Sequence, residues 1–366
     1  MGQYSYSSGS QLFILFTICV IFICLSKQQT KIPKLILISM DGMRYNYLDN
    51  LPDGKIANFK YFMKNGVKAK FIRNVFPSST FPNHVSIASG LYPESHGIVS
   101  NNFWDPYLQD VFRLGNYRQN FESKWFDVGA EPIWVTNHGA GSPRDSGVVM
   151  WPGGVAEIKS FMPRVIPALY WNNVTYNWTL RVDNMIDWFQ NNKTNVRPIN
   201  LGILYFEEPD EVAHKYGPDT DNLVTKEVQE KIFELDDILG YIKKKLIETN
   251  LIDEMNIILT SDHGQTDIGK NKMINLDNFV SRSLYTTRGI GLGSLVTNMN
   301  PTKGITISYL CFKTIKIHFF SIELCQGLST SEHLLFENCS VFTFYTSTTY
   351  TELLHVKSPD FPDLFL

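Results

Sequence analysis

Three short apolar runs, each followed closely by acidic residues or histidine, constrain the fold of this chain more than any other feature. They extend from Lys34 to Met40, from Asn200 to Phe206 and from Asn256 to Thr260, and they are typical of buried strands. Helical patterns separate them, the longest being an amphipathic one from Thr225 to Thr249. This alternation predicts an α/β fold with a largely parallel central sheet and helices on both faces.

Weaker patterns lie between these runs. We predict a helix at Asn58 to Asn65 and strands at Ala69 to Phe76 and Glu131 to Thr136. From about Thr306 the helix–strand alternation ends. We therefore divide the chain into a leader, residues 1–26, a main domain, residues 31–305, and a tail of uncertain fold, residues 306–366.

Acidic residues and a histidine follow the three runs at corresponding positions. Asp41 follows the first run, Asp210 lies just after the second, and Asp262 and His263 follow the third. Because ligands of α/β sheets bind at the carboxyl ends of the strands, we expect these side chains to meet. A single Asp after a strand is a common turn residue, but three at matching positions favour a site.

A metal site would use these residue types. If the segment after Pro209 opens a helix, Asp210 and His214 lie on one helix face, because they are four residues apart. Carboxylate together with imidazole suits zinc, whereas sets of oxygen ligands alone suit magnesium or calcium. Taken singly, such a pair is more often a surface or capping pair.

Thr80 is the candidate nucleophile. It precedes Pro82, and proline is favoured at the start of a helix, which we expect to continue from Asn83 until Gly90 ends it. A hydroxyl at or beside a helix N-cap lies near free backbone N–H groups. Most threonines in this context are ordinary caps, but two metal ions about 4 Å apart could activate this hydroxyl to attack phosphorus.

The leader and the glycosylation motifs predict passage through the secretory pathway. Leu12 to Leu25 is apolar but shorter than a bilayer span, so we predict a signal peptide, with an uncleaved signal anchor as the alternative. Either way, the protein would be secreted or would face the outside of the plasma membrane, with membrane contact only through an uncleaved leader. Four Asn-x-Ser/Thr motifs agree with this: Asn173, Asn177, Asn192 and Asn338.

Charge and cysteine content exclude two classes of protein. The net charge of −3 argues against a dedicated nucleic-acid binder. Two of the five cysteines, Cys19 and Cys24, lie in the leader, and three lie in the tail, so the main domain is not a disulfide scaffold. The pairing of Cys311, Cys325 and Cys339 stays open.

Several long motifs resemble the ectonucleotide pyrophosphatase/phosphodiesterase family of the alkaline phosphatase-like superfamily. They occur in the family order and read LISMDGMRYNYL, FPSSTFPNHVSIASGLYPESHGIV, EPIWVT, YFEEPDEVAHKYGP and LTSDHGQT. The resemblance extends from about residue 31 to roughly residue 300. It implies an extracellular zinc hydrolase that cleaves phosphodiester or pyrophosphate bonds of nucleotides or dinucleotides.

The resemblance also implies a role for each matching residue. Thr80 would attack phosphorus and form a threonyl-phosphate intermediate, Asn101 would donate to the phosphoryl oxygens, and Phe81 would help to line a nucleoside slot. Asn101 could instead be a turn residue and Phe81 a core residue. Two Zn²⁺ ions are implied, the first held by Asp41, Thr80, Asp262 and His263 and the second by Asp210 and His214.

One departure from the family pattern concerns the second zinc. The family supplies a further histidine from a downstream Gly-x-His-Gly segment, which this sequence lacks, since His318, His333 and His355 are not followed by Gly. The missing ligand would weaken the second metal site. Two alternatives therefore remain: a catalytically impaired secreted binding protein, and a phosphodiesterase that acts on choline-type lipids. Sulfatases of the superfamily are disfavoured, because their formylglycine-forming motif is absent at Thr80.

Overall fold

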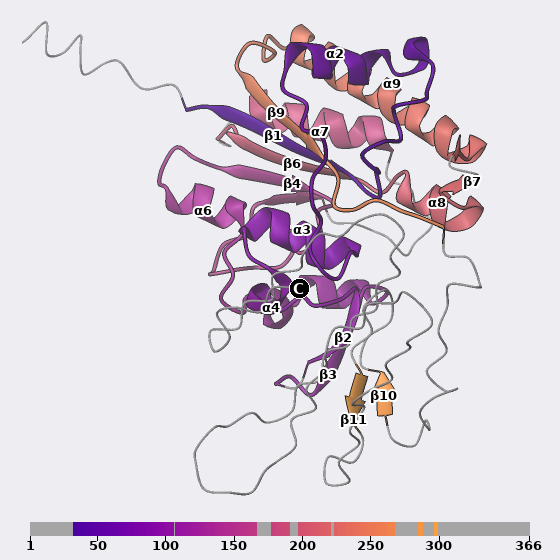
Figure 1. Cartoon of the computed structure of the whole chain (residues 1–366). Coiled ribbons are helices and arrows are strands. Elements are labelled where there is room, and N and C mark those ends of the chain that lie inside the picture. The colour runs from indigo at the N-terminus through magenta and orange to yellow at the C-terminus, as the bar shows by residue number, and fades with distance from the viewer. Residues whose placement is uncertain are drawn as a thin grey trace, which may run out of the picture.

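A five-stranded parallel sheet forms the centre of the molecule (Figure 1). The computed structural model describes residues 32–105, 107–166, 177–190, 197–220 and 223–267, with two short strands at 285–287 and 296–298. The sheet has the order β5-β4-β6-β1-β9, and each neighbouring pair is parallel. Its strands are β1 (Lys34–Met40), β4 (Ser146–Val149), β5 (Arg164–Ile166), β6 (Leu201–Phe206) and β9 (Met255–Thr260). The predicted parallel sheet is therefore confirmed.

The three apolar runs form adjacent strands. In β1, Leu37 pairs with Ile203 of β6 on one side and with Ile258 of β9 on the other. Every residue of β6 is buried, as expected for a strand between two others and beneath helices. In the edge strand β9 exposed and half-buried residues alternate, and Ile258 is 49% exposed. Because the three strands are parallel neighbours, their carboxyl ends lie at one edge of the sheet.

Helices cover both faces of the sheet (Figure 1). The helices α2 (Ala57–Asn65), α7 (Trp178–Gln190) and α9 (Lys226–Glu248) pack together on one face. On the other face lie α3 (Thr80–Ser89) and α6 (Ile133–Gly139). The apolar stripe of α9 is buried, with Val228, Ile232 and Leu235 fully covered.

The remaining elements are short. Two antiparallel pairs lie outside the main sheet, and a third is formed by the last two strands that the structure describes. The elements are η1 (Asp53–Lys55), α4 (Pro93–His96), β2 (Asn102–Asp105), β3 (Asp110–Arg113), η2 (Tyr117–Phe121), α5 (Ser123–Phe126), α8 (Asp210–Tyr216), β7 (Asp219–Thr220), β8 (Leu223–Val224), β10 (Tyr285–Thr287) and β11 (Val296–Asn298).

Two predicted strands are wrong. The segment from Glu131 to Thr136 contains the start of helix α6, because the chain turns helical after Pro132 and buries Trp134. The segment from Ala69 to Phe76 forms no strand and is mostly exposed. Its β-branched and aromatic residues have strand propensity, but a strand also needs a neighbour to pair with.

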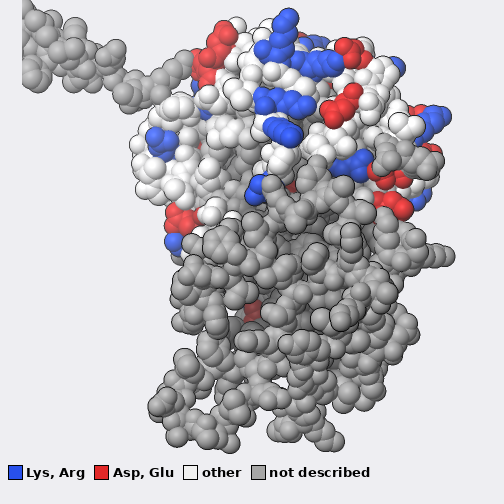
Figure 2. Space-filling model, viewed as in Figure 1, with Lys and Arg blue, Asp and Glu red and all other residues white. Residues whose placement is uncertain are grey.

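Basic side chains gather over α2 and the segment that follows it (Figure 2). Five exposed residues of α2 and of the segment 66–76 are basic: Lys60, Lys64, Lys68, Lys70 and Arg73. The net charge of the whole chain is nevertheless −3, so this basic area is local.

Several predictions fall outside the described residues. These are the leader 1–26, the tail 306–366 with its cysteines and histidines, and the motifs at Asn173, Asn192 and Asn338. Asn177 is described and exposed just before α7, where its Oδ1 accepts hydrogen bonds from N and Oγ1 of Thr179. Within the described part of the chain, no helix is both long and apolar enough to span a bilayer.

Candidate metal centre and active site

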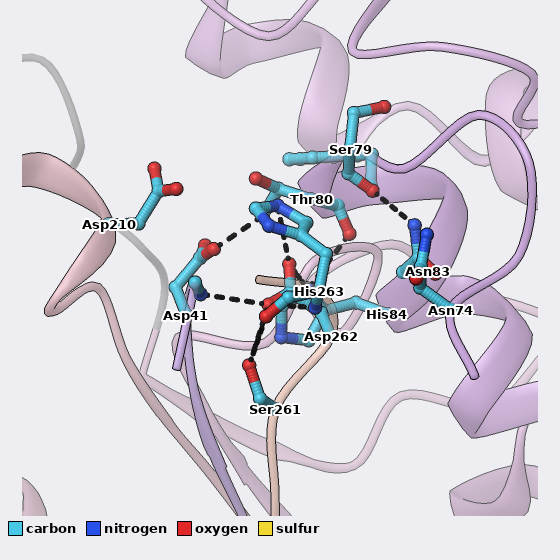
Figure 3. A network of polar contacts seen from close by, with 12 residues as sticks. Asp41, Asn74, Ser79, Thr80, Asn83, His84, Asp210, Ser261, Asp262 and His263 are labelled. Carbon is cyan, nitrogen blue, oxygen red and sulfur yellow. Dashed lines mark hydrogen bonds and ion pairs between the residues drawn. The ribbon is translucent and has the colours of Figure 1, made fainter. Parts of the chain in front are cut away.

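The carboxyl ends of β1, β6 and β9 bring three acidic residues into one region (Figure 3). Asp41 directly follows β1, and its backbone N–H donates to the carbonyl of Phe206 at the end of β6 (2.9 Å). The backbone N–H of Asp210 donates in turn to the carbonyl of Asp41 (3.1 Å). The parallel sheet and two hydrogen bonds between loops thus align residues that are far apart in the sequence.

Asp41, Asp262 and His263 together could hold a metal ion. One ligand atom from each lies within 4.8 Å of the others. Nε2 of His263 is 3.5 Å from Oδ1 of Asp41 and 3.2 Å from Oδ2 of Asp262. These two carboxylate oxygens are buried and have no hydrogen-bond partner. Buried polar atoms are nearly always satisfied, so both oxygens have the character of ligands that face a cation.

The electrostatics of this cluster also favour a cation. Burial raises the pKa of Asp41 well above its usual value, and the neighbouring charges of Asp262 and Asp210 raise it further. Burial raises the pKa of Asp262 to about 7. Carboxylates this close together in a desolvated site repel one another when ionised, and a bound cation would reverse that cost. The residues present therefore fit a metal ion with mixed oxygen and nitrogen ligands.

The other oxygens of the cluster are held by the protein. Oδ1 of Asp262 accepts hydrogen bonds from the backbone N–H groups of Gly42 (3.1 Å) and His263 (2.9 Å). Oδ2 of Asp41 accepts from the hydroxyl of Tyr205 (2.6 Å). Each carboxylate is thereby fixed through one oxygen while the other faces the cluster, which orients both groups before any metal binds.

Thr80 is the first residue of α3 and lies beside the cluster (Figure 3). Ser79 occupies the N-cap position with extended backbone, so the predicted placement of Thr80 at a helix start is confirmed. Nδ1 of His84 lies 2.8 Å from the carbonyl oxygen of Thr80 and 3.4 Å from Oδ2 of Asp262. The ring of His84 therefore contacts both the start of α3 and a carboxylate of the candidate metal site.

Asn101 is hydrogen-bonded to the start of α3, where its Oδ1 accepts from the N–H of Phe81 (2.8 Å). Because that bond uses the amide oxygen, the Nδ2 hydrogens of Asn101 can donate to a ligand at the helix start. The ring of Phe81 is only 1% exposed and packs near Phe112 and Phe126. This packing favours the core role of Phe81 over a role in a nucleoside slot.

Asp210 and His214 form a pair rather than a complete metal site. Both lie in α8, and Nε2 of His214 is 3.3 Å from Oδ2 of Asp210, so the expected placement on one helix face is confirmed. The hydrogen bond to Asp210 raises the pKa of His214. Oδ1 of Asp210 contacts Nε2 of Gln265. Among the described residues, no third histidine, cysteine or carboxylate joins this pair in a metal-binding cluster.

Two further buried residues, His84 and Tyr205, contact the cluster and were not expected from the sequence. His84 lies four residues after Thr80 in α3, a spacing that places both on one helix face and that could have been noticed. Tyr205 lies in the apolar run of β6, where an aromatic residue gives no signal of a polar role. Its hydroxyl reaches Asp41 only because β1 and β6 are neighbours.

A family model described as type I phosphodiesterase / nucleotide pyrophosphatase matches residues 35–310. The chain belongs to this family. The ectonucleotide pyrophosphatase/phosphodiesterases are its relatives here, and the sheet with helices on both faces is their alkaline phosphatase-like fold. The resemblance found in the sequence motifs is thus confirmed.

Individual relatives are similar over most of this chain. The bis(5'-adenosyl)-triphosphatase enpp4 of Xenopus laevis is 37% identical over 278 residues, which are 75% of this chain and 57% of that protein. Human ectonucleotide pyrophosphatase/phosphodiesterase family member 5 is 38% identical over 254 residues, 69% of this chain and 49% of that protein. The chain therefore spans about half the length of these two relatives.

A solved structure agrees with these similarities. Murine ectonucleotide pyrophosphatase/phosphodiesterase 5, an inactive threonine-to-alanine variant in complex with AMP, superposes with a TM-score of 0.63 and 36% identity. The superposition covers 73% of this chain and 66% of the murine chain.

Proposed function

We propose that this protein is a zinc-dependent nucleotide pyrophosphatase/phosphodiesterase that uses Thr80 as nucleophile. The observation that carries the proposal is the pair of buried carboxylate oxygens without partners, Oδ1 of Asp41 and Oδ2 of Asp262, which face His263 beside the start of α3. Relatives support the substrate class, since one is a bis(5'-adenosyl)-triphosphatase and another binds AMP as an inactive threonine-to-alanine variant.

Asp41, Asp262, His263 and the hydroxyl of Thr80 would hold one Zn²⁺, and Asp210 with His214 would contribute to a second. When bound, these ions would lower the pKa of a hydroxyl and offset negative charge that develops on a phosphoryl group. The donor set suits zinc because it combines carboxylate and imidazole. The second site depends on ligands beyond the described residues, or binds its ion more weakly.

The protein's own groups suggest how the reaction proceeds. Thr80 Oγ1 attacks phosphorus as the bond to the leaving oxygen breaks, and a threonyl-phosphate ester forms. Water then attacks the phosphorus, the bond to Thr80 breaks, and the hydroxyl is restored. Nδ2 of Asn101 donates to the phosphoryl oxygens, since its Oδ1 already accepts the N–H of Phe81. The amide of Asn101 would thereby stabilise the negative charge that develops on the phosphoryl oxygens during the attack.

Secretion to the cell exterior completes the proposal. The apolar leader and the glycosylation motifs indicate it, and the relatives are named as ectoenzymes. We expect attached glycans at Asn173, Asn177, Asn192 and Asn338. Peptide-N-glycosidase treatment of the secreted protein, followed by mass spectrometry, would test each position.

Purified protein and a chromogenic nucleotide phosphodiester test the mechanism. We expect turnover that a chelator abolishes and that added Zn²⁺ restores. Thr80→Ala should remove turnover while metal binding by Asp41, Asp262 and His263 largely remains. Thr136→Ala is a matched control, because the hydroxyl of Thr136 in α6 donates to Glu131 at the surface, away from the cluster. Activity that survives both the chelator and Thr80→Ala rules the mechanism out.

The same preparation separates the alternatives. Side-by-side kinetics with the nucleotide and with a choline-type phospholipid distinguish the two phosphodiesterase activities. A single tightly bound zinc ion per chain without any turnover would instead indicate the impaired binding protein.

A further inference from the structure

His84 is a fully buried histidine that no step of the proposed reaction uses. It lies in α3, is 0% exposed, and has a partner at each ring nitrogen. Nδ1 is 2.8 Å from the carbonyl oxygen of Thr80, and Nε2 is 2.9 Å from Oγ of Ser39 in β1. The ring therefore links the first residue of α3 to the central strand of the sheet.

The partners of the ring determine its tautomer. A carbonyl oxygen only accepts, so the hydrogen must be on Nδ1. Nε2 is then the acceptor, and the hydroxyl of Ser39 donates to it. These two hydrogen bonds together hold the ring in this single tautomer.

The hydrogen on Nδ1 also lies near the candidate metal site. Nδ1 is 3.4 Å from Oδ2 of Asp262, one of the two buried oxygens without a hydrogen-bond partner. An N–H donor at this distance from the oxygen helps to orient the carboxylate. One ring thus contacts both the main chain of Thr80 and a carboxylate that would hold the metal (Figure 3).

Surrounding aromatic residues prevent the ring from turning. It packs edge-on against Trp151 and Tyr205, with ring centroids 4.7 Å and 5.0 Å away. Nε1 of Trp151 donates to the carbonyl of His84, and the hydroxyl of Tyr205 donates to Asp41. One of the two aromatic residues that hold the ring, Tyr205, therefore also contacts the other carboxylate of the cluster.

We propose that His84 is a positioning residue that fixes the distance between the Thr80 nucleophile and the metal held by Asp262. It acts through the Thr80 carbonyl and the Asp262 carboxylate and does not touch substrate. This inference rests on the proposed function, in which Thr80 attacks and Asp262 binds metal. Its physical basis is that groups which orient metal ligands contribute strongly to metal affinity and rate, and that nucleophile placement is sensitive to small shifts.

Three variants of the full chain test it. His84→Asn keeps an N–H donor at the position of Nδ1, His84→Leu removes it, and Ser39→Ala removes the hydroxyl that donates to Nε2. We expect His84→Leu to lower kcat about 10- to 100-fold with little change in KM, and to weaken Zn²⁺ in chelator competition by a similar factor. His84→Asn should recover most of both losses, and Ser39→Ala should lie between.

His96 provides the matched control. It is also buried and also paired with a serine, since its Nε2 lies 2.9 Å from Oγ of Ser86, but it does not contact the cluster. His96→Leu should lower Tm as His84→Leu does while it leaves kcat and zinc affinity unchanged. If His84→Leu fails to fold, the comparison of His84→Asn and Ser39→Ala with wild type still decides the question.

The outcomes separate this inference from the proposed function. Zinc binding in Thr80→Ala, with and without His84→Leu, gives a readout that needs no turnover. Equal kcat and zinc affinity in wild type, His84→Leu and His84→Asn, or losses that only follow Tm as in His96→Leu, would overturn the positioning role while the proposed function stands. A wild type without zinc-dependent turnover would instead contradict the proposed function itself.

Discussion

The hydroxyl of Tyr205 donates a 2.6 Å hydrogen bond to Oδ2 of Asp41, although the two residues are 164 positions apart in the sequence. The bond exists because β1 and β6 are parallel neighbours and both side chains are buried at the same end of the sheet. It lowers the pKa of Asp41, in opposition to the larger effects of burial and of the neighbouring acidic residues. A tyrosine in an apolar strand thus helps to keep a candidate metal ligand ionised.

Tyr205→Phe should therefore weaken metal binding at low pH. Without the hydroxyl the pKa of Asp41 rises further, so protons compete with the metal more effectively. We expect the midpoint of zinc binding to move to higher pH by about half a unit to one unit, as measured by chelator competition across a pH series. Tyr241→Phe is the control, since that hydroxyl bonds to Asp183, away from the site. Equal midpoints for the two variants would contradict the role of Tyr205.

Local patterns in the sequence were sufficient for the centre of the fold. The runs that became β1, β6 and β9 are continuous and apolar, and α9 has a long regular stripe, so each element has a strong local signal. The residues that follow these runs could be expected to meet without knowledge of the strand order, because parallel strands end at the same side of the sheet. Asp41, Asp262 and His263 were predicted to meet for this reason.

Tertiary contacts decided the remaining elements. The residues from Ile133 to Thr136 have high strand propensity but form a helix, since Pro132 favours a helix start and Trp134 has a core position to fill. The strand β4 contains only four residues, too few for a pattern to stand out. Tyr205 gains its polar role from Asp41 after the neighbouring strand, and the contact of His84 with Ser39 likewise comes from another strand, so no local window reveals these two contacts.

Without metal, the protein should lose stability as the pH rises from about 4 to about 7. Burial raises the pKa of Asp262 from 3.8 to about 7, so between these values the folded state keeps a proton that the unfolded chain has lost. The free energy of unfolding therefore falls with rising pH, by about 1.4 kcal/mol for each unit of pKa difference as an upper bound.

Urea denaturation of chelator-treated protein at pH 5 and pH 7 would measure this loss. Asp262→Asn cannot ionise and should flatten the profile, whereas Asp49→Asn in an exposed turn should leave it unchanged. Saturating zinc should reverse the trend, because the metal binds the ionised carboxylates. A metal-free wild type that is more stable at pH 7 than at pH 5 would contradict the prediction.

The buried ion pair between Arg181 and Glu207 should be important for stability. Arg181 is 0% exposed and donates to both carboxylate oxygens of Glu207, at 2.5 Å and 3.0 Å, and to the carbonyl of Tyr205. Arg181→Met leaves the Glu207 carboxylate buried without its partner and should cost about 3 to 5 kcal/mol. Adding Glu207→Gln should recover part of this loss, because the uncompensated charge disappears.

A double-mutant cycle in urea would measure the coupling of this pair. The exposed pair of Lys226 and Glu230 in α9 is the control, and Lys226→Met should change stability by less than about 0.5 kcal/mol. Additive losses from Arg181→Met and Glu207→Gln would show that the two side chains do not depend on each other.

Gly42→Ala should disturb the site through a steric contact as well as through backbone strain. Gly42 has a φ of +66°, and a Cβ there would lie 2.9 Å from both Cβ and Oδ1 of Asp210. Gly217 has a φ of +85°, but no atom lies within 4 Å of a Cβ placed there. Gly217→Ala therefore measures backbone strain alone, and we expect it to lower the free energy of unfolding by about 1 kcal/mol. We expect Gly42→Ala to cost more than Gly217→Ala in urea denaturation and also to weaken zinc binding, because Asp210 must move and the Gly42 N–H bond to Asp262 is disturbed. Equal zinc affinity in the two variants would mean that the turn after β1 tolerates the methyl group without moving the carboxylates.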